Sequence, residues 1–115
     1  FSRIKGGLPF CHQSVVVRAD IKKKYPFNLK YKYASDYDNF CRIFRDSAIV
    51  VKRLENTTIS KVTEGGAADL NRIITASEYI DIAITHFGFS SLKQHIFRWV
   101  RVQCSVLLRR ISVRK

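Results

Sequence analysis

Apolar residues return at helical spacing after Ser35, and this pattern predicts the best-defined helix of the chain. Its apolar stripe, at positions i, i+3, i+4 and i+7, consists of Tyr37, Phe40, Cys41 and Phe44. We expect Ser35 to be the N-cap and Asp38, three residues later, to complete a capping box. Asp38 also precedes Arg42 by one helical turn, a spacing that favours an ion pair. Neighbouring residues alone therefore specify where this helix starts.

Two further helices are predicted in the second half of the chain. The first is capped by Asp69 and ends at Gly88. Its apolar side carries Leu70, Ile73, Ile74, Ile80, Ile84 and Phe87. The second helix begins near Ser90. Its apolar face carries Leu92, Ile96, Trp99, Val100 and Leu107.

Runs of β-branched residues predict three short strands. One covers residues 8–18, which include three consecutive valines, and the others cover residues 48–51 and 57–62, on either side of a turn. Residues 19–24 are expected to form a short helical turn, which Pro26 ends because it disfavours the helical conformation of the residue before it. Short strands together with three main helices predict an α/β fold.

Composition and charge limit the function classes. A chain of 115 residues forms one domain at most, and 46% hydrophobic with 26% charged residues excludes a disordered or low-complexity chain. The 21 Lys and Arg residues outnumber 9 Asp and Glu residues, and the formal net charge of +12 favours phosphates, nucleotides, nucleic acid or anionic lipid as partners. No apolar run reaches about 18 residues, so we expect no membrane-spanning helix.

The cysteines and the first residue add two expectations. Cys11, Cys41 and Cys104 are odd in number and lack CxxC spacing, which favours buried free thiols in a reducing compartment. A zinc site is not expected, because Cys11 and His12 would point to opposite faces of a strand. The chain begins with Phe1 and contains no methionine, so we expect it to be a piece of a longer protein.

The sequence Asp36-Tyr37-Asp38 is the main candidate for chemistry. An Asp-x-Asp motif can hold a divalent cation, but such motifs usually close an apolar strand, whereas this one opens a helix, so we expect no metal ligands here. An acidic residue in the first turn is also favoured by the helix macrodipole. Asp36 is therefore either a structural acid or a general base positioned beside a reacting hydroxyl, and both interpretations stay open at this point.

Four motifs follow one another in a characteristic order. They are residues 7–14 (GLPFCHQS), 25–28 (YPFN), 35–42 (SDYDNFCR) and 64–66 (EGG). In this order and spacing, over about residues 6–84, they resemble the C-terminal half of the family 2 glycosyltransferases. The resemblance implies a GT-A fold, in which residues 1–88 are the C-terminal, acceptor-side half and a Rossmann-like, donor-binding half lies upstream.

The resemblance also implies an activity and its residues. It implies inverting transfer of a sugar from a nucleotide-diphosphate donor to an acceptor hydroxyl, in the synthesis of a surface polysaccharide. By position, Asp36 is the catalytic base, and His12 and Gln13 line the acceptor side of the pocket. The residues expected to support the helix start are Ser35, Asp38 and Arg42. A divalent cation, Mg²⁺ or Mn²⁺, and the nucleotide would be bound outside this chain, so the fragment alone is expected to be inactive.

Residues 89–115 are predicted to form a basic amphipathic helical tail. Seven Lys or Arg residues stand between positions 93 and 115, with Trp99 among many aliphatic residues, and no acidic residue follows Asp81. This composition is typical of a helix on an anionic membrane surface, although the tail could equally pack on the domain. We therefore expect a cytoplasmic protein, peripheral on the inner face of the membrane, that acts on a sugar or lipid-linked acceptor.

Two other functions stay open. A basic nucleic-acid-binding module would use the aromatic residues that alternate with lysines in residues 25–33, but a solvated basic loop is the preferred interpretation, so nucleic acid is not the expected partner. A non-catalytic membrane adaptor would need the tail and not Asp36.

Overall fold

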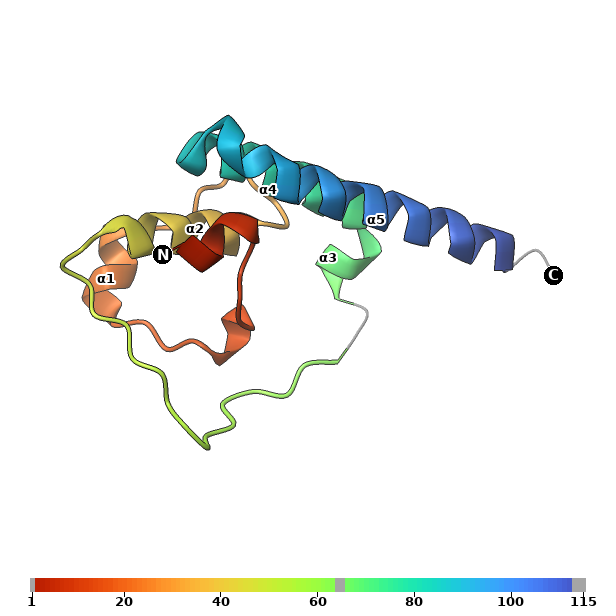
Figure 1. Ribbon diagram of the computed structural model, residues 1–115. Coiled ribbons are helices and arrows are strands. Elements are labelled where there is room, and N and C mark those ends of the chain that lie inside the picture. Colours follow the sequence, from red (N-terminus) through yellow and green to blue (C-terminus); the bar gives the residue numbers. More distant parts are fainter. Residues whose placement is uncertain (1, 64–65, 113–115) are drawn as a thin grey trace.

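The computed structural model describes residues 2–63 and 66–112, and every regular element in these ranges is a helix (Figure 1). The 3₁₀ turns are η1 (Ser2–Gly6), η2 (His12–Ser14) and η3 (Phe89–Ser91). The α-helices are α1 (Ala19–Lys24), α2 (Ser35–Arg45), α3 (Ala67–Leu70), α4 (Arg72–Phe87) and α5 (Leu92–Ser112). No strand occurs among the described residues, so the predicted α/β fold, and with it the GT-A architecture, is wrong.

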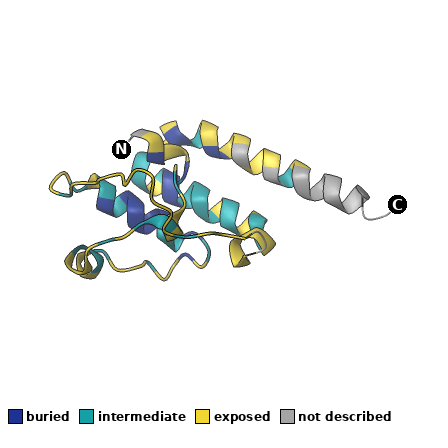
Figure 2. Ribbon diagram, turned by 90° about the horizontal axis from the view of Figure 1, so that it is seen from below, coloured by how far each residue is buried: buried dark blue, intermediate teal, exposed yellow. Residues whose placement is uncertain are grey.

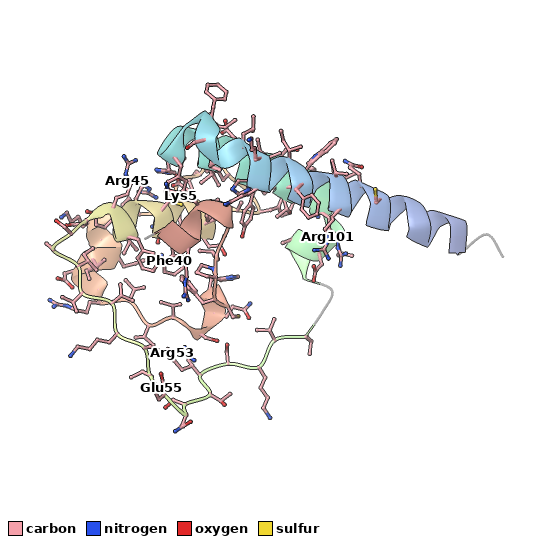
Figure 3. The ribbon with its side chains drawn as sticks, in the orientation of Figure 1. Lys5, Phe40, Arg45, Arg53, Glu55 and Arg101 are labelled. Carbon is pink, nitrogen blue, oxygen red and sulfur yellow. The ribbon has the colours of Figure 1, made fainter. Side chains whose placement is uncertain are left out.

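The three predicted strands are irregular chain in the structure. Residues 8–18 contain the turn η2, and residues 48–51 and 57–62 lie in a long segment that loops away from the helices. Figure 3 shows Arg53 and Glu55 on this outlying segment. A side-chain hydrogen bond of 2.9 Å between Ser14 and Ser60 links two of the segments. A β-branched run becomes a strand only when a second strand pairs with its backbone, which is a condition that a local pattern does not test.

Helix α2 starts at Ser35 as predicted, but a side chain of another helix holds the chain that leads into it. Its N-cap residue is Ala34, and neither Ser35 nor Asp38 caps it. Instead the Glu78 carboxylate of α4 accepts hydrogen bonds from the backbone N–H groups of Lys32, Tyr33 and Ala34, at 2.9, 2.8 and 2.8 Å. The predicted capping box is therefore wrong, because a carboxylate distant in sequence holds the chain that enters the helix.

The predicted apolar stripe of α2 faces the core. Tyr37 and Cys41 have no exposed surface and Phe40 is buried, while Phe44 packs against them from the edge. Tyr37 stacks on Tyr79 of α4, with ring centroids 4.5 Å apart. The buried core residues are Ile4, Tyr31, Ala34, Tyr37, Phe40, Cys41, Ile43 and Ile82. Four of them lie on α2, Ile82 lies on α4, Ile4 lies in η1, and Tyr31 and Ala34 lie in the loop before α2. Figure 2 shows the buried parts of the ribbon in dark blue.

Helices α4 and α5 form an antiparallel hairpin. Gly88 ends α4 with a φ of 69°, as its predicted role requires, and α5 runs back along α4 before extending past it (Figure 1). Asp69 does not cap α4, because it lies inside α3 and Asn71 is the N-cap. Residues 64 and 65 of the EGG motif, and the side chain of Leu107, lie outside the described residues.

The turn η1 makes hydrogen bonds with both α2 and α5. The Tyr37 hydroxyl donates a hydrogen bond of 3.0 Å to the carbonyl of Ile4, and His95 Nε2 lies 2.6 Å from the carbonyl of Lys5. Both side chains are buried. His95 is the one buried position among the described side chains of α5, since the apolar residue Ile96 is 47% exposed and Leu92 is only half-buried. The apolar face predicted for this helix is therefore only partly packed on the protein.

The three thiols differ in environment. All are free, Cys41 is buried, and Cys11 and Cys104 are exposed, so the prediction of buried thiols holds for Cys41 alone. Burial, helped by the negative charge of Asp38, raises the pKa of the Cys41 thiol to about 12.

Thiol counting with Ellman's reagent at pH 8 tests this difference. Two thiols are expected to react rapidly in the folded chain, because the reactive thiolate of Cys41 is suppressed and covered. The third should react only in denaturant. Cys41→Ala should leave the rapid phase unchanged, and a rapid phase of three thiols would contradict the burial of α2.

Replacement of Glu78 tests the contact that holds the chain before α2. Glu78→Ala removes the acceptor of three backbone N–H groups and is expected to lower the free energy of unfolding by about 2 kcal/mol in urea denaturation. The matched control is Glu55→Ala, whose exposed pair with Arg53 should contribute about 0–1 kcal/mol. Equal effects of the two substitutions would argue against a stabilising role of the Glu78 contact.

Candidate functional site

A histidine and an aspartate meet at the start of α2. The turn η2 places His12 Nδ1 2.9 Å from Asp36 Oδ2. The other oxygen, Oδ1, accepts a hydrogen bond of 2.8 Å from the backbone N–H of Tyr37. The side chain of His12 is 49% exposed and that of Asp36 is 19% exposed. Asp36 is therefore held in one orientation while solvent still reaches it.

This arrangement leaves Asp36 able to accept a further hydrogen bond. An ionised carboxylate has about four lone-pair positions, and two are used here, one on each oxygen. The contact also fits the tautomer of His12 in which Nδ1 carries the proton. The pair can therefore take a proton from a hydroxyl group placed beside it.

Asp38, two residues further on, lies in the interior. Arg42 Nε donates to its Oδ2 at 2.9 Å, and His86 Nε2 lies 2.8 Å from its Oδ1. The Asp38 and His86 side chains are 4% and 8% exposed. Arg45 approaches the other ring nitrogen of His86 at 3.5 Å. This cluster fixes the C-terminal end of α4 to α2, and it contains the predicted ion pair of Asp38 with Arg42.

The sequence indicated neither Arg45 nor His86 as a member of this cluster, and His86 is the more buried of the two. It follows Ile82 by one turn on α4, on the side of the helix that faces the core, and this is not the predicted apolar side, since Ile73 and Ile74 are 43% and 51% exposed. A histidine there needs a polar partner, but only the packing of α4 on α2 reveals that the partner is Asp38.

Two cationic side chains, those of Lys22 and Arg42, lie near Asp36. Lys22 Nζ donates to Asn39 Oδ1 at 3.1 Å and lies 3.5 Å from the centre of the Phe27 ring. Burial, followed by the charge of Arg42, lowers the pKa of Lys22, while the charge of Asp36 opposes this shift. The region beside Asp36 therefore carries positive charge together with one aromatic ring.

The other predicted residues take peripheral places. Gln13 is exposed and follows His12 in η2, and Ser35 is half-buried as the first residue of α2. A hollow lies between α1 and the chain after α2, but none of these residues lines it. Its lining consists of Arg18, Asp20, Ile21, Lys24, Asp46, Ala48, Ile49 and Val50.

The two carboxylates of the Asp-x-Asp motif do not converge on one point. Asp36 pairs with His12, whereas Asp38 pairs with Arg42 and His86. Across residues 2–63 and 66–112, no group of three or more His, Cys, Asp or Glu side chains could hold a metal ion. Within the same ranges, no helix has the length and apolar content that crossing a membrane requires.

Comparisons of this chain with models of protein families, with curated proteins and with solved structures found no match. Any function assigned to it must therefore be argued from the order of its motifs and from the geometry of the site.

Stability measurements should separate the two aspartates. Asp38→Asn removes the buried charge that Arg42 and His86 face, and is expected to cost about 3 kcal/mol of unfolding free energy. The matched control, Asp36→Asn, changes a partly exposed carboxylate and should cost about 1 kcal/mol or less. Urea denaturation of both variants checks this order, and the reverse order would show that Asp36 is the structural acid.

Proposed function

We propose that this chain supplies the acceptor-side residues of an inverting glycosyltransferase, with Asp36 as the general base. The observation that carries the proposal is the Asp36 carboxylate, which His12 and the backbone of Tyr37 hold at the start of α2 within reach of solvent. The order of the motifs in the sequence supports the same assignment. Neither the site nor the order of the motifs requires an α/β architecture.

In the proposed reaction, the oxygen of an acceptor hydroxyl attacks the anomeric carbon of a nucleotide-diphosphate sugar. A new bond forms between them, the bond from the anomeric carbon to the diphosphate oxygen breaks, and the nucleoside diphosphate leaves with both electrons of that bond. The hydroxyl proton passes to Asp36. Such proton transfer contributes about 10²–10⁴-fold to a rate when the base is in hydrogen-bond reach of the proton.

The remaining site residues have supporting roles in this proposal. His12 keeps the carboxylate turned outward and, with the exposed Gln13, lines the surface where the acceptor sugar binds. The proposed cofactor is Mg²⁺ or Mn²⁺, held by residues outside this chain, where it would neutralise the leaving diphosphate. We place the reaction at the cytoplasmic face of a membrane, with a surface polysaccharide as product.

Nucleic-acid binding is the weaker alternative. The aromatic rings of residues 25–33 would have to be open for bases to stack on them. Tyr31 is buried, and its hydroxyl donates to Asp81. The hydroxyl of the half-buried Tyr25 donates to Asp46, and Lys22 lies over the ring of Phe27, which is 48% exposed. Tyr25 and Tyr31 are thus used within the chain.

Asp36→Asn, introduced into the protein that contains this chain, tests the proposal. The probes are UDP-glucose, UDP-galactose, UDP-N-acetylglucosamine and GDP-mannose, each with a bacterial lipid extract and Mg²⁺ or Mn²⁺. Release of nucleoside diphosphate should fall by about 10²–10⁴-fold because the base is lost. The donor dissociation constant, measured by calorimetry, should be unchanged.

A control substitution shows whether a loss of rate is specific to Asp36. Asp20→Asn changes an exposed acid on α1, which is paired only with Arg18 in the ion pairs of the described chain, and should leave the rate unchanged. An undiminished rate in Asp36→Asn, with donor still bound, would falsify the role of Asp36. Absence of transfer by the unsubstituted protein with every donor would reject the proposed activity itself.

A further inference from the structure

Helix α5 has an apolar stripe that the rest of the described chain leaves uncovered. We call Ile96, Phe97, Val100 and Cys104 the outer stripe of α5. Ile96, Phe97 and Val100 are 47%, 68% and 47% exposed, and Cys104 is also exposed. Their spacing of one, four and eight residues after Ile96 places them along one side of the helix.

The side of α5 next to Ile96 packs on the protein. His95 is 1% exposed and bonds to the carbonyl of Lys5, and Leu92 and Gln103 are half-buried. One helical turn is about 3.6 residues, so these positions lie away from Phe97 and Cys104 around the axis. Ile96 borders this packed side, whereas Phe97, Val100 and Cys104 stay exposed beyond it.

The charges beside the outer stripe indicate what covers it. Lys93 and Arg101 are exposed on the same helix, and Figure 3 shows Arg101 projecting from α5. No acidic residue follows Asp81, and the formal net charge of the chain is +12. A second copy of this chain would bring an equally positive helix against the stripe, whereas a negatively charged surface would be attracted to it.

We propose that the outer stripe of α5 binds an anionic lipid surface. Phe97 and Val100 enter the boundary between headgroups and acyl chains, and Lys93 and Arg101 contact the headgroup phosphates. Trp99, 36% exposed, lies beside the stripe. Tryptophan rings prefer the boundary between lipid headgroups and acyl chains, where this ring would then lie. This inference does not depend on the proposed glycosyl transfer, because it uses none of the residues around Asp36.

Vesicle binding by the full chain tests this inference. The probes are vesicles of phosphatidylcholine with or without a quarter of phosphatidylglycerol, separated by sedimentation. Trp99 is the only tryptophan, so its emission reports directly on α5 and should shift to shorter wavelength on the anionic vesicles. Binding to phosphatidylcholine alone should be at least tenfold weaker, and higher salt should weaken binding to the anionic vesicles.

Two variants test the residues. Phe97→Ser with Val100→Ser should weaken binding at least tenfold. Lys93→Gln with Arg101→Gln should weaken it about fivefold for each charge removed, and leave the apolar contact intact. The matched control is Val50→Ser with Val51→Ser, in the outlying segment after α2, where the side chains are 79% and 64% exposed and no change is expected. Circular dichroism confirms that each variant remains helical.

Several results would overturn the inference. They are undiminished binding after either pair of α5 substitutions, equal binding to both kinds of vesicle, and equal loss of binding in the Val50 and Val51 control. Displacement of the chain from vesicles by millimolar inorganic phosphate would show that the site binds free phosphate and not a lipid surface. A concentration-dependent dimer that Phe97→Ser abolishes, or tighter binding to single-stranded RNA than to anionic vesicles, would assign the stripe to those partners instead.

Discussion

The geometry of the site depends on one carboxylate, that of Glu78. It accepts hydrogen bonds from three consecutive backbone N–H groups just before α2, and so fixes the point at which the chain turns into the helix. Asp81, one turn later on α4, accepts hydrogen bonds from Lys30 and Tyr31 of the same loop. The position of Asp36 is therefore set by a helix more than forty residues away in sequence.

Helical geometry then separates the two aspartates of α2. Residues two positions apart on an α-helix project about 200° apart around its axis. One of them must face inward when the other faces out. Asp38 faces α4, where Arg42 and His86 neutralise and bond it, and Asp36 faces the turn that carries His12. A buried carboxylate with two charged or polar partners supports the fold, while a half-covered carboxylate with spare lone pairs can react.

Hydrogen bonds to the turn η1 connect the helix of the site, α2, with α5. The turn η1 receives the hydroxyl of Tyr37 from α2 and the imidazole of His95 from α5. These contacts hold the packed side of α5 against the body that carries Asp36, and they leave the outer stripe free (Figure 2). If that stripe rests on lipid, the same contacts keep Asp36 at a constant distance from the membrane, which suits an acceptor that is anchored there.

The helices were determined by the sequence itself, because 3.6-residue periodicity, a stripe such as that of Tyr37 and Phe40, and a stop such as Gly88 are local properties. The ion pair of Asp38 with Arg42 is local for the same reason. Tertiary structure alone decided the rest. Whether the valines of residues 8–18 form a strand depends on a pairing partner, and whether a polar group is capped or buried depends on side chains such as Glu78 and His86, which folding brings from distant parts of the chain.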